Sequence, residues 1–527
     1  MANGTTNKTS VDFPQPRTSL AVVDNQTSWQ WTNNNDFYKM LPAPYFMFYN
    51  NWVREWLRWY DGYVPWVHGG AMGLLSTRIG TTLVDRCADS VFGGNLMFAN
   101  ARKPMHRVEK NGKSVGAALD FISNDFSNKT GFKSKIKQAI KNAFAGGFSL
   151  LKLNVCGGEL WIDSLRADRF YIDVTARGEI RKSVCFLSFY DKMTDGKEDG
   201  KRYALVEERR YEKIGMFGDE IPVVEYKIYD TSVQIQYFTT DSNNFIAYEQ
   251  LPQSVKKAFK SEYSFKLNEP QALNGFKDLG VYLIKASDEI SNVPQINLGE
   301  SLLSHITTYL YEYDFYNTAF NTDMYLARGR VLVPKALQSP QAKSGAQNAG
   351  LDDFLYTKIE TMNTDAQKPE AIQFALRAEE WKSARNMLLE SIATSIGMSV
   401  STLASYISDG GNRTAREVSA EESATTLFIE NARRRFEKPI NDLISTVLRY
   451  YGYVDDVEIR WSRAGMTNQT VLVDTLTKAV NAGLISEKKA HHAFNYDDDE
   501  EQNEEDYELV KEQQAQRQNT IFGGDTF

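Results

Sequence analysis

The sequence lacks the motifs with which many enzymes hold phosphates, metals or acyl groups. It contains no G-x-x-x-x-G-K-S/T loop for ATP, no H-E-x-x-H zinc motif and no G-x-S-x-G nucleophile turn. His491 and His492 are adjacent, so on a helix their side chains would point about 100° apart, which is unfavourable for binding one metal ion. We therefore expect no catalytic residues, no cofactor and no metal site, and we predict that the protein is not an enzyme.

Long apolar runs are also missing, and cysteine is scarce. The mean hydropathy is -0.45, and no stretch is long and apolar enough to predict a membrane span. Residues 1–19 are rich in Asn, Thr and Ser without the apolar core of a signal peptide, so we expect the protein to stay where it is made. The three cysteines, Cys87, Cys156 and Cys185, are far apart in the sequence, which indicates free buried thiols and not a disulfide framework.

Basic charge is not in excess, since the net charge is -8 and most of it is local. Residues 497–508 hold nine acids and no base, and without them the chain is close to neutral. This balance argues against a protein that wraps DNA by neutralising its phosphates. Nine like charges resist burial, so we expect this acidic stretch to be solvated and residues 513–527 to be mobile.

The strongest pattern that is present is a pair of long helices joined by a glycine-bearing loop. With 527 residues and 42% apolar content, the chain can form more than one domain. Apolar residues at three- and four-residue steps predict a helix over 377–396. Thr414-Ala415-Arg416-Glu417 forms a capping box that opens a second helix, which would be about 50 Å long and kinked at Pro439.

Other segments have recognisable periods. Over residues 148–237, apolar and polar residues alternate with a period of two, which predicts an antiparallel meander. For example, Leu151, Leu153 and Val155 alternate with Lys152 and Asn154. Tryptophans at 52, 56 and 59 share one helical face, and packing is favoured over membrane contact. Further helices are predicted over 74–92, 131–144, 298–320, 467–482 and from Ser486, and further strands over 328–334, 354–359, 371–374 and 455–461.

The order of helix, glycine-bearing loop, Asn412-Arg413-Thr414-Ala415-Arg416-Glu417-Val418-Ser419 and long helix resembles the core of tailed-bacteriophage portal proteins. It is most similar to the portal group of siphophages of Gram-positive hosts, in which a TATEV segment opens the long helix. Here Arg416 replaces the second Thr of that segment. The resemblance covers most of the chain beyond Ile290 and is weaker before it.

The resemblance implies an α+β portal fold with wing, stem, clip and crown regions, long channel-lining helices and a β-meander in the wing. Mapped onto this sequence, it predicts a flexible N-terminal arm (1–35), a wing (36–296), a first stem helix (297–322), a clip (323–376), a second stem helix (377–397), a tunnel-loop region (398–413), a long kinked wing helix (414–453), a crown (454–496) and an acidic and polar tail (497–527).

The resemblance also implies a function. Twelve copies would form a ring at one capsid vertex, the channel through which double-stranded DNA is packaged and ejected. The implied partners are the terminase packaging motor, the major capsid protein, a scaffold if present and a head–tail adaptor, in the host cytoplasm during assembly and then in the virion. The implied channel residues are those of the tunnel loop, Ser408, Asp409, Gly410, Gly411, Asn412, Arg413 and Arg416, with Lys382 and Arg385 as possible stem positions.

Alternative interpretations remain open from the residues themselves. The chain could be a nucleic-acid-processing enzyme, such as a nuclease using scattered carboxylates, or another structural protein of a virion. The lysine-rich helix 131–144 and the run Arg433-Arg434-Arg435 could contact DNA, although a solvated or salt-bridged helix face is the more frequent role of such patterns.

Overall fold

In the computed structural model, described residues fall into two compact units, formed by 1–61, 81–304 and 414–527 and by 62–80 and 305–413. Within these units the structure describes residues 43–64, 74–93, 96–100, 117–156, 158–175, 178–194, 197–213, 220–230, 246–262, 266–288, 298–327, 330–334, 356–359, 370–372, 377–399, 415–453, 457–461, 469–494 and 506–513. Each unit is described by itself below.

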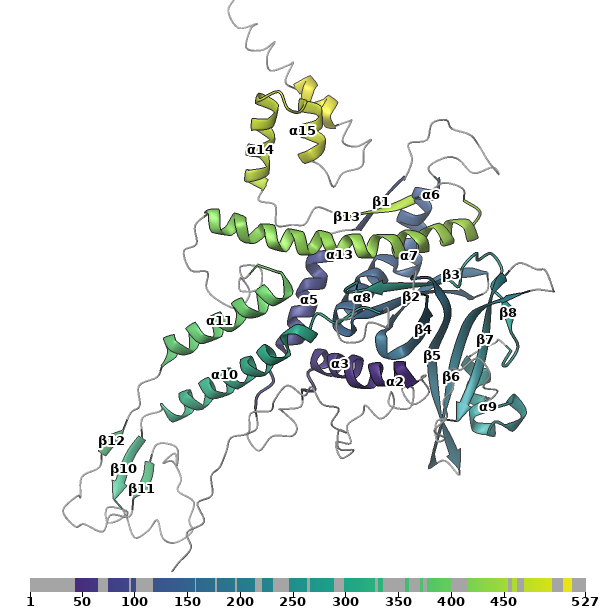
Figure 1. The fold of residues 1–527 in the computed structure, drawn as a ribbon, viewed down its shortest axis with the longest axis horizontal. Helices are drawn as coiled ribbons and strands as arrows, with labels where there is room; N and C mark the ends of the chain where they lie inside the picture. Colours follow the sequence, from purple (N-terminus) through teal and green to yellow (C-terminus); the bar gives the residue numbers. More distant parts are fainter. Residues whose placement is uncertain are drawn as a thin grey trace, which may run out of the picture. The chain divides into compact units, whose positions relative to one another are not determined.

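The first unit contains a three-stranded sheet in the order β3-β2-β9, with α8 packed on it (Figure 1). Its central strand β2 (Phe148–Cys156) pairs antiparallel with β3 (Glu159–Arg166) and with β9 (Val281–Lys285). Helix α8 (Phe132–Gly146) buries Phe132, Ile136 and Ile140. The predicted helix over 131–144 is therefore confirmed, with its apolar stripe in the core.

A five-stranded sheet in the order β4-β5-β6-β7-β8 forms the second sheet of this unit. All its strand pairs are antiparallel. The strands predicted for the period-two segment are confirmed up to Asp230, but they divide between two sheets at the 3-10 turn Ala167–Arg169, and the last part of that segment, 231–237, lies outside the described residues. The strands are β4 (Phe170–Val174), β5 (Ile180–Thr194), β6 (Lys197–Lys213), β7 (Glu220–Asp230) and β8 (Gln271–Ala272).

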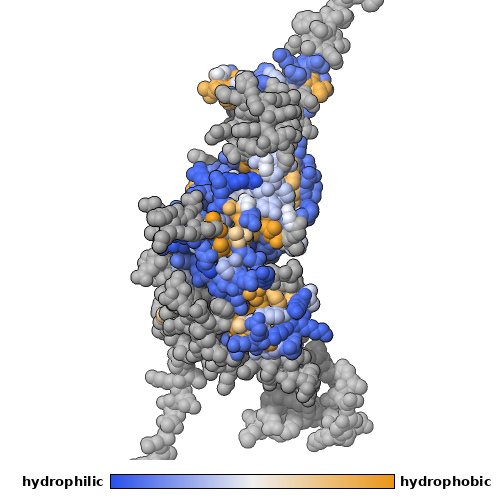
Figure 2. Space-filling view, turned by 90° about the vertical axis from the view of Figure 1, so that its right-hand side faces the viewer, coloured by the Kyte–Doolittle hydropathy of each residue, from blue (hydrophilic) through white to orange (hydrophobic). Residues whose placement is uncertain are grey.

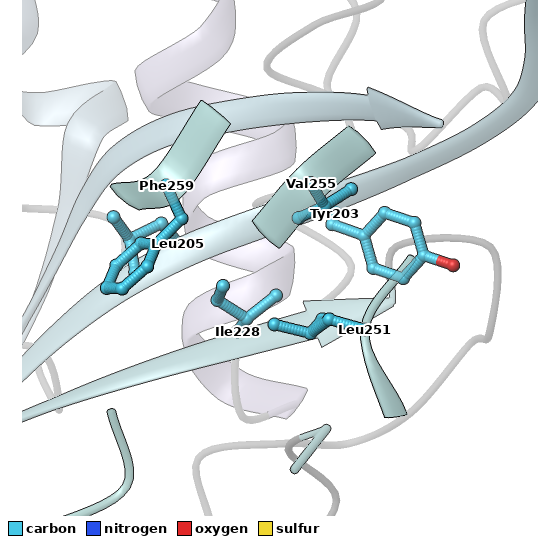
Figure 3. Close-up of a cluster of buried hydrophobic side chains, with 6 residues drawn as sticks. All are labelled: Tyr203, Leu205, Ile228, Leu251, Val255 and Phe259. Atoms are coloured by element: carbon cyan, nitrogen blue, oxygen red, sulfur yellow. The ribbon is translucent and has the colours of Figure 1, made fainter. Parts of the chain in front are cut away.

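Helix α9 (Gln253–Glu262) covers part of this second sheet (Figure 1). Figure 3 shows the buried cluster at this contact, in which side chains from β6 and β7 meet those of α9 and of Leu251, just before the helix. Burying these apolar groups away from water is the main stabilising contribution of the contact. The cluster consists of Tyr203, Leu205, Ile228, Leu251, Val255 and Phe259.

Helix α13 (Ala415–Tyr450) is the long helix predicted from the capping box, and it remains one continuous helix past Pro439 (Figure 1). Its apolar face is buried at three- and four-residue steps, as the sequence pattern requires. Strand β13 (Val457–Trp461), also predicted, pairs antiparallel with β1 (Leu96–Asn100). The buried face includes Ile429, Phe436, Ile440, Leu443, Ile444 and Val447.

Aromatic side chains hold the first described segment against strands of both sheets. Helix α2 (Ala43–Phe48), a π-helical turn (Tyr49–Val53) and α3 (Arg54–Asp61) follow one another. The hydroxyl of Tyr49 donates to the Phe170 carbonyl at 3.0 Å, and the ring of Phe48 stacks on that of Phe148 at 6.3 Å. Trp56 is buried and the Trp52 ring lies 6.3 Å from its ring, which supports the packing interpretation of the tryptophans.

The remaining elements of the first unit include two further predicted helices. Helix α14 (Gln469–Asn481) ends near Gly483, which has a φ of 69°, and α15 (Glu487–Phe494) begins after Ser486, whose hydroxyl accepts from the Lys489 N–H at 3.3 Å. Residues 506–513 are helical, which the sequence did not predict. The other helices are α5 (Ile79–Phe92), α6 (Ala117–Asp120), a π-helical turn (Phe121–Phe126) and α7 (Ser127–Thr130).

In the second unit, α10 (Thr307–Leu326) and α11 (Ala378–Ile396) pack side by side (Figure 1). Both ends of the chain segment between them lead into a three-stranded sheet in the order β11-β10-β12. The predicted helix 377–396 and the predicted strands between the helices are thus confirmed as elements. The strands are β10 (Arg330–Pro334), β11 (Tyr356–Ile359) and β12 (Glu370–Ile372).

Two predicted helix starts are wrong. Residues 298–303 are not helical, and α10 begins at Thr307 and not near Leu298. The reason is that Ser301 is used elsewhere: its hydroxyl donates to the carbonyls of Phe144 and Ala145, at 3.0 and 2.7 Å, and closes the end of α8. Residues 74–78 are likewise not helical, and α5 begins at Ile79.

The cysteine prediction is confirmed for two of the three residues. Cys87 and Cys185 are free and buried, and burial raises the pKa of the Cys87 thiol to about 12. A thiol that stays protonated at neutral pH is a poor nucleophile, so Cys87 has a packing role. The side chain of Cys156 lies outside the described residues.

Candidate channel and DNA-contact residues

The predicted tunnel loop, Ser408 to Arg413, lies outside the described residues. The side chain of Arg416 lies outside them as well, although its backbone belongs to α13. The helix before the loop ends in a regular way: Gly397 has a φ of 76°, and the N–H of Met398 reaches back to the Ala393 carbonyl at 2.9 Å. The channel assignment of the loop therefore stays a prediction.

The two predicted stem residues differ in their surroundings. Lys382 is exposed on α11, whereas Arg385 is half-buried. Burial raises the pKa of Tyr313 on α10, and the positive charge of Arg385 partly opposes that rise, so the guanidinium lies near this hydroxyl. Arg385 is thus the more enclosed of the two, and Lys382 is the more accessible.

Asp323 near the end of α10 fixes the register of the two helices. Its Oδ2 accepts from the Trp381 indole N–H and from the Arg377 guanidinium, both at 2.8 Å. These two hydrogen bonds lower the pKa of Asp323, with that of Trp381 contributing most. The Tyr316 ring meets the Trp381 ring edge-on at 5.8 Å. Trp381 belongs to the apolar residues that predict the helix 377–396, but its partner Asp323 was not predicted, because an aspartate in a helical sequence does not indicate which distant residue it contacts.

A second aspartate of α10 explains why residues 74–78 are not helical. Asp314 is buried, and its Oδ1 accepts from both the N–H and the hydroxyl of Thr77, at 2.9 and 2.6 Å. The N–H of Leu75 donates to the Thr318 hydroxyl at 3.0 Å. The N–H groups of Leu75 and Thr77 are thus bonded to side chains of α10 and not to carbonyls of a helix of their own. Residues 74–78 therefore lie against α10 in a non-helical conformation.

The run Arg433-Arg434-Arg435 is divided by the helix into different environments. Arg433 donates from Nε to the Val91 carbonyl at 2.8 Å, and its guanidinium lies over the Trp461 ring at 5.4 Å. Within the part of the chain that the structure describes, Arg434 forms a long ion pair with Glu430 at 3.9 Å, and Arg435 forms one with Asp288 at 3.8 Å. Arg433 therefore has a structural role, while its two neighbours are weakly paired.

The lysines of α8 lie on its outer face, opposite the buried stripe. Lys137 pairs with Asp89 and Lys141 with Asp85, both at 2.8 Å and all partly exposed. The ammonium group of Lys133 lies over the Phe98 ring at 5.7 Å. Exposed ion pairs of this kind are worth less than about 1 kcal/mol each, so they suit a solvated face. The interpretation as a solvated face over a core stripe is therefore favoured.

The histidine pair and the helices of the described segments offer neither a metal site nor a membrane span. In that part of the chain, no group of three or more His, Cys, Asp or Glu residues could hold a metal ion. The rings of His491 and His492 are 6.4 Å apart at 65°, and His491 instead meets the Tyr507 ring at 5.6 Å. Among the helices described, none has the length and apolar character that crossing a membrane requires.

Comparisons with known proteins place these features in context. The family model described as phage portal protein, SPP1 Gp6-like, matches residues 104–520. A chain in the neck of an empty GTA particle, computed with C6 symmetry, is similar at 12% identity over 82% of this chain and 92% of that chain, with a TM-score of 0.43. A chain in the neck of a native GTA particle, computed with C12 symmetry, is similar at 13% identity over the same shares, with a TM-score of 0.39. No curated protein matches the chain.

Proposed function

Because the chain belongs to the SPP1 Gp6-like family of phage portal proteins, we propose that it assembles into a closed ring at one capsid vertex. The match over residues 104–520 is the single observation that carries the proposal. It gives no support to the nuclease alternative. Twelve copies, the number that the family resemblance implies, would surround a channel for double-stranded DNA.

The mechanism of such a ring is geometric and not chemical. Helices α10 and α11 would be the two stem helices, with the sheet β11-β10-β12 between them as the clip and α13 as the long wing helix. The hydrogen bonds that Trp381 and Arg377 donate to Asp323 support this assignment, because they would keep the two stem helices in register while DNA moves past them. Lys382, being exposed, is the better of the two stem candidates for a position on the channel wall.

The loop residues Ser408 to Arg413 and Arg416 would contact the moving DNA. Gly410 and Gly411 accept many backbone angles, so the loop could change shape as DNA passes. The wing would take residues 36–296, the crown 454–496 and the tail 497–527. The ring would act in the virion and assemble in the host cytoplasm with the terminase motor, the major capsid protein, a scaffold if present and a head–tail adaptor, and it would not itself be an enzyme.

Light scattering coupled to size exclusion tests the proposal directly. Copies of 59.9 kDa should give a closed particle of about 0.7 MDa if twelve assemble. Negative-stain top views should then show a ring with a central opening. Monomers or dimers across the whole accessible concentration range would contradict the proposal.

A further inference from the structure

A groove of about 610 Å³ lies between α13 and β9 in the first unit. Its α13 side comes from positions three and four residues apart, which share one face of the helix. Its β9 side comes from Leu283 and Lys285, which are two positions apart and so lie on the same face of this edge strand of the three-stranded sheet. The groove is lined by Leu283, Lys285, Asp288, Asn431, Arg434, Arg435, Lys438 and Pro439.

The charges in this groove are not balanced. Four of the lining residues are cations and only Asp288 is a carboxylate. Asp288 is 77% exposed and lies 3.8 Å from Arg435, and Arg434 is 75% exposed and lies 3.9 Å from Glu430, which are long distances for ion pairs. Burial lowers the pKa of Lys285, although Asp288 partly opposes this. Positive charges are thus held close together, and one is partly removed from water.

The cations are attached to elements that are already fixed. The opposite face of α13 is buried through Phe436 and Ile440, and β9 is paired with β2 along its length. The backbone that carries the cations would therefore need no further ordering when an anion binds, and the entropy cost would be that of fixing the side chains.

We propose that this groove binds phosphates of the double-stranded DNA backbone, at residues separate in sequence from the predicted tunnel loop. The choice of DNA rests on the proposed function as a portal. Guanidinium groups match the geometry of phosphate oxygens, and lysines add point charges. Phosphate contacts of this kind require no apolar pocket, since their free energy comes from counterion release.

An acidic peptide is the competing occupant, because carboxylates also suit arginine. Peptide and protein partners gain most of their affinity from a few large side chains that fill apolar pockets. Leu283 and Pro439 are the only apolar residues among those that line this groove, and the rest of its apolar surface is the stems of charged or polar side chains, which offer no pocket for a large side chain. Figure 2 shows one face of the molecule, on which orange hydrophobic areas lie among blue hydrophilic residues. The groove therefore favours a ligand recognised by charge.

The test uses the full chain and a short fluorescent DNA duplex whose binding is measured over a range of salt concentrations. The association constant falls as salt is added, so a plot of its logarithm against the logarithm of salt concentration has a negative slope. In the variant Arg434→Gln/Lys438→Gln, this slope should become shallower by about 1.8, the contribution of two phosphate contacts. Affinity at low salt should fall roughly tenfold or more. The control Lys257→Gln/Lys266→Gln removes two exposed cations of another surface and should leave the slope unchanged.

A charge-preserving variant, Arg434→Lys/Lys438→Arg, should retain most of the duplex binding, which separates lost charge from damaged folding. The proposal is overturned if the Gln variant and the control show the same slope, or if the Gln variant loses binding of poly-glutamate but not of the duplex. Light scattering on the same samples reports the ring separately. Rings that form while the slope stays unchanged would reject the groove and leave the proposed function intact, whereas absence of rings in the unmodified chain would reject the proposed function.

Discussion

Lys152 of β2 and Glu207 of β6 form an ion pair of 3.0 Å whose side chains are only 2% and 3% exposed. Arg209 donates to the same carboxylate at 2.7 Å and also to the carbonyls of Leu279 and Gly280. One carboxylate is therefore the shared counter-charge of two buried cations, and its pair with Lys152 joins the three-stranded sheet to the five-stranded sheet. A buried pair of this kind is sensitive to the removal of either partner.

The first prediction concerns the loss of this carboxylate. Glu207→Gln leaves Lys152 and Arg209 buried without a counter-charge, and it should lower the free energy of unfolding by about 3–5 kcal/mol. Lys152→Met should cost less, because the pair of Glu207 with Arg209 remains. The midpoint of thermal unfolding at matched protein concentration measures both.

A matched control for this substitution is Glu212→Gln. Glu212 lies on the same strand and pairs with Arg210 at 2.7 Å, but its side chain is 41% exposed. Its loss should cost less than about 1 kcal/mol. Equal destabilisation by Glu207→Gln and Glu212→Gln would show that the buried ion pairs of Glu207 contribute no more to the free energy of unfolding than an exposed pair does.

The second prediction is the pH dependence that follows from Glu207. Burial alone would raise its pKa, but Arg209 and Lys152 lower it, to about 2 from an ordinary value of 4.5. Because the folded-state pKa is the lower one, the stabilisation is complete above about pH 4.5 and is lost as pH falls towards 2. The full effect is roughly 3 kcal/mol. As the pH is lowered from 4.5 to 2, the unfolding midpoint of the unmodified chain should fall, and that of Glu207→Gln should fall less. Identical pH profiles for the two proteins would argue against this contribution of Glu207.

Much of the secondary structure could be predicted, because it depends on local periodicity. The apolar stripe of α11 and the turn at Gly483 each act within a few residues, and the capping box predicted at Thr414, which lies outside the described residues, is a signal of the same local kind. The pairing of β1 with β13 could not be predicted, since its strands are more than 350 positions apart along the chain. Local patterns do not state which distant strand completes a sheet.

Strand β2 shows where the period-two pattern misleads. The alternation predicts Leu151, Leu153 and Val155 inside with Lys152 outside, yet Lys152 is buried and Val155 is 45% exposed. The strand is covered on both faces: Ser149 donates to the Ala139 carbonyl of α8 on one side, and Lys152 meets Glu207 on the other. A lysine can be buried only where its partner is present, and the partner lies on a strand that the pattern of β2 does not identify.

The candidate site was predictable to a smaller extent than the fold. The sequence identified Lys382 and Arg385 by their helix, but not that Arg385 is half-buried near Tyr313. The arginine run was visible in the sequence, but the groove needed Lys285 from β9 as well. Residues brought together by tertiary contacts give no shared signal along one chain.

The third prediction concerns the close approach of Gly147 and Gly299. A Cβ on Gly299 would overlap the carbonyl of Gly147, where neither backbone can move without breaking the bond from the Ala286 N–H to that carbonyl, 2.8 Å long. Gly299→Ala should therefore lower the free energy of unfolding by about 3 kcal/mol or more. The measurement is the unfolding midpoint in denaturant.

Gly158→Ala supplies the control for this substitution. Gly158 has a φ of 84°, but nothing lies within 4 Å of the point where an alanine Cβ would stand, so only the backbone cost of about 1–2 kcal/mol applies. If Gly299→Ala proved less destabilising than Gly158→Ala, the contact between the two glycine segments would not be tight in solution.

The last prediction separates DNA passage from ring assembly in the loop from Ser408 to Arg413. Its tip, Ser-Asp-Gly-Gly-Asn, offers almost no apolar area and hence little interface energy, so assembly should not depend on it. Replacing Gly410 and Gly411 with proline fixes φ at both positions, whereas alanine at both leaves more freedom and serves as the control. The proline variant should form rings and join capsids, but the yield of packaged DNA should fall well below that of the alanine variant. Failure to form rings, or packaging at the normal rate and yield, would show that this loop is not the channel element.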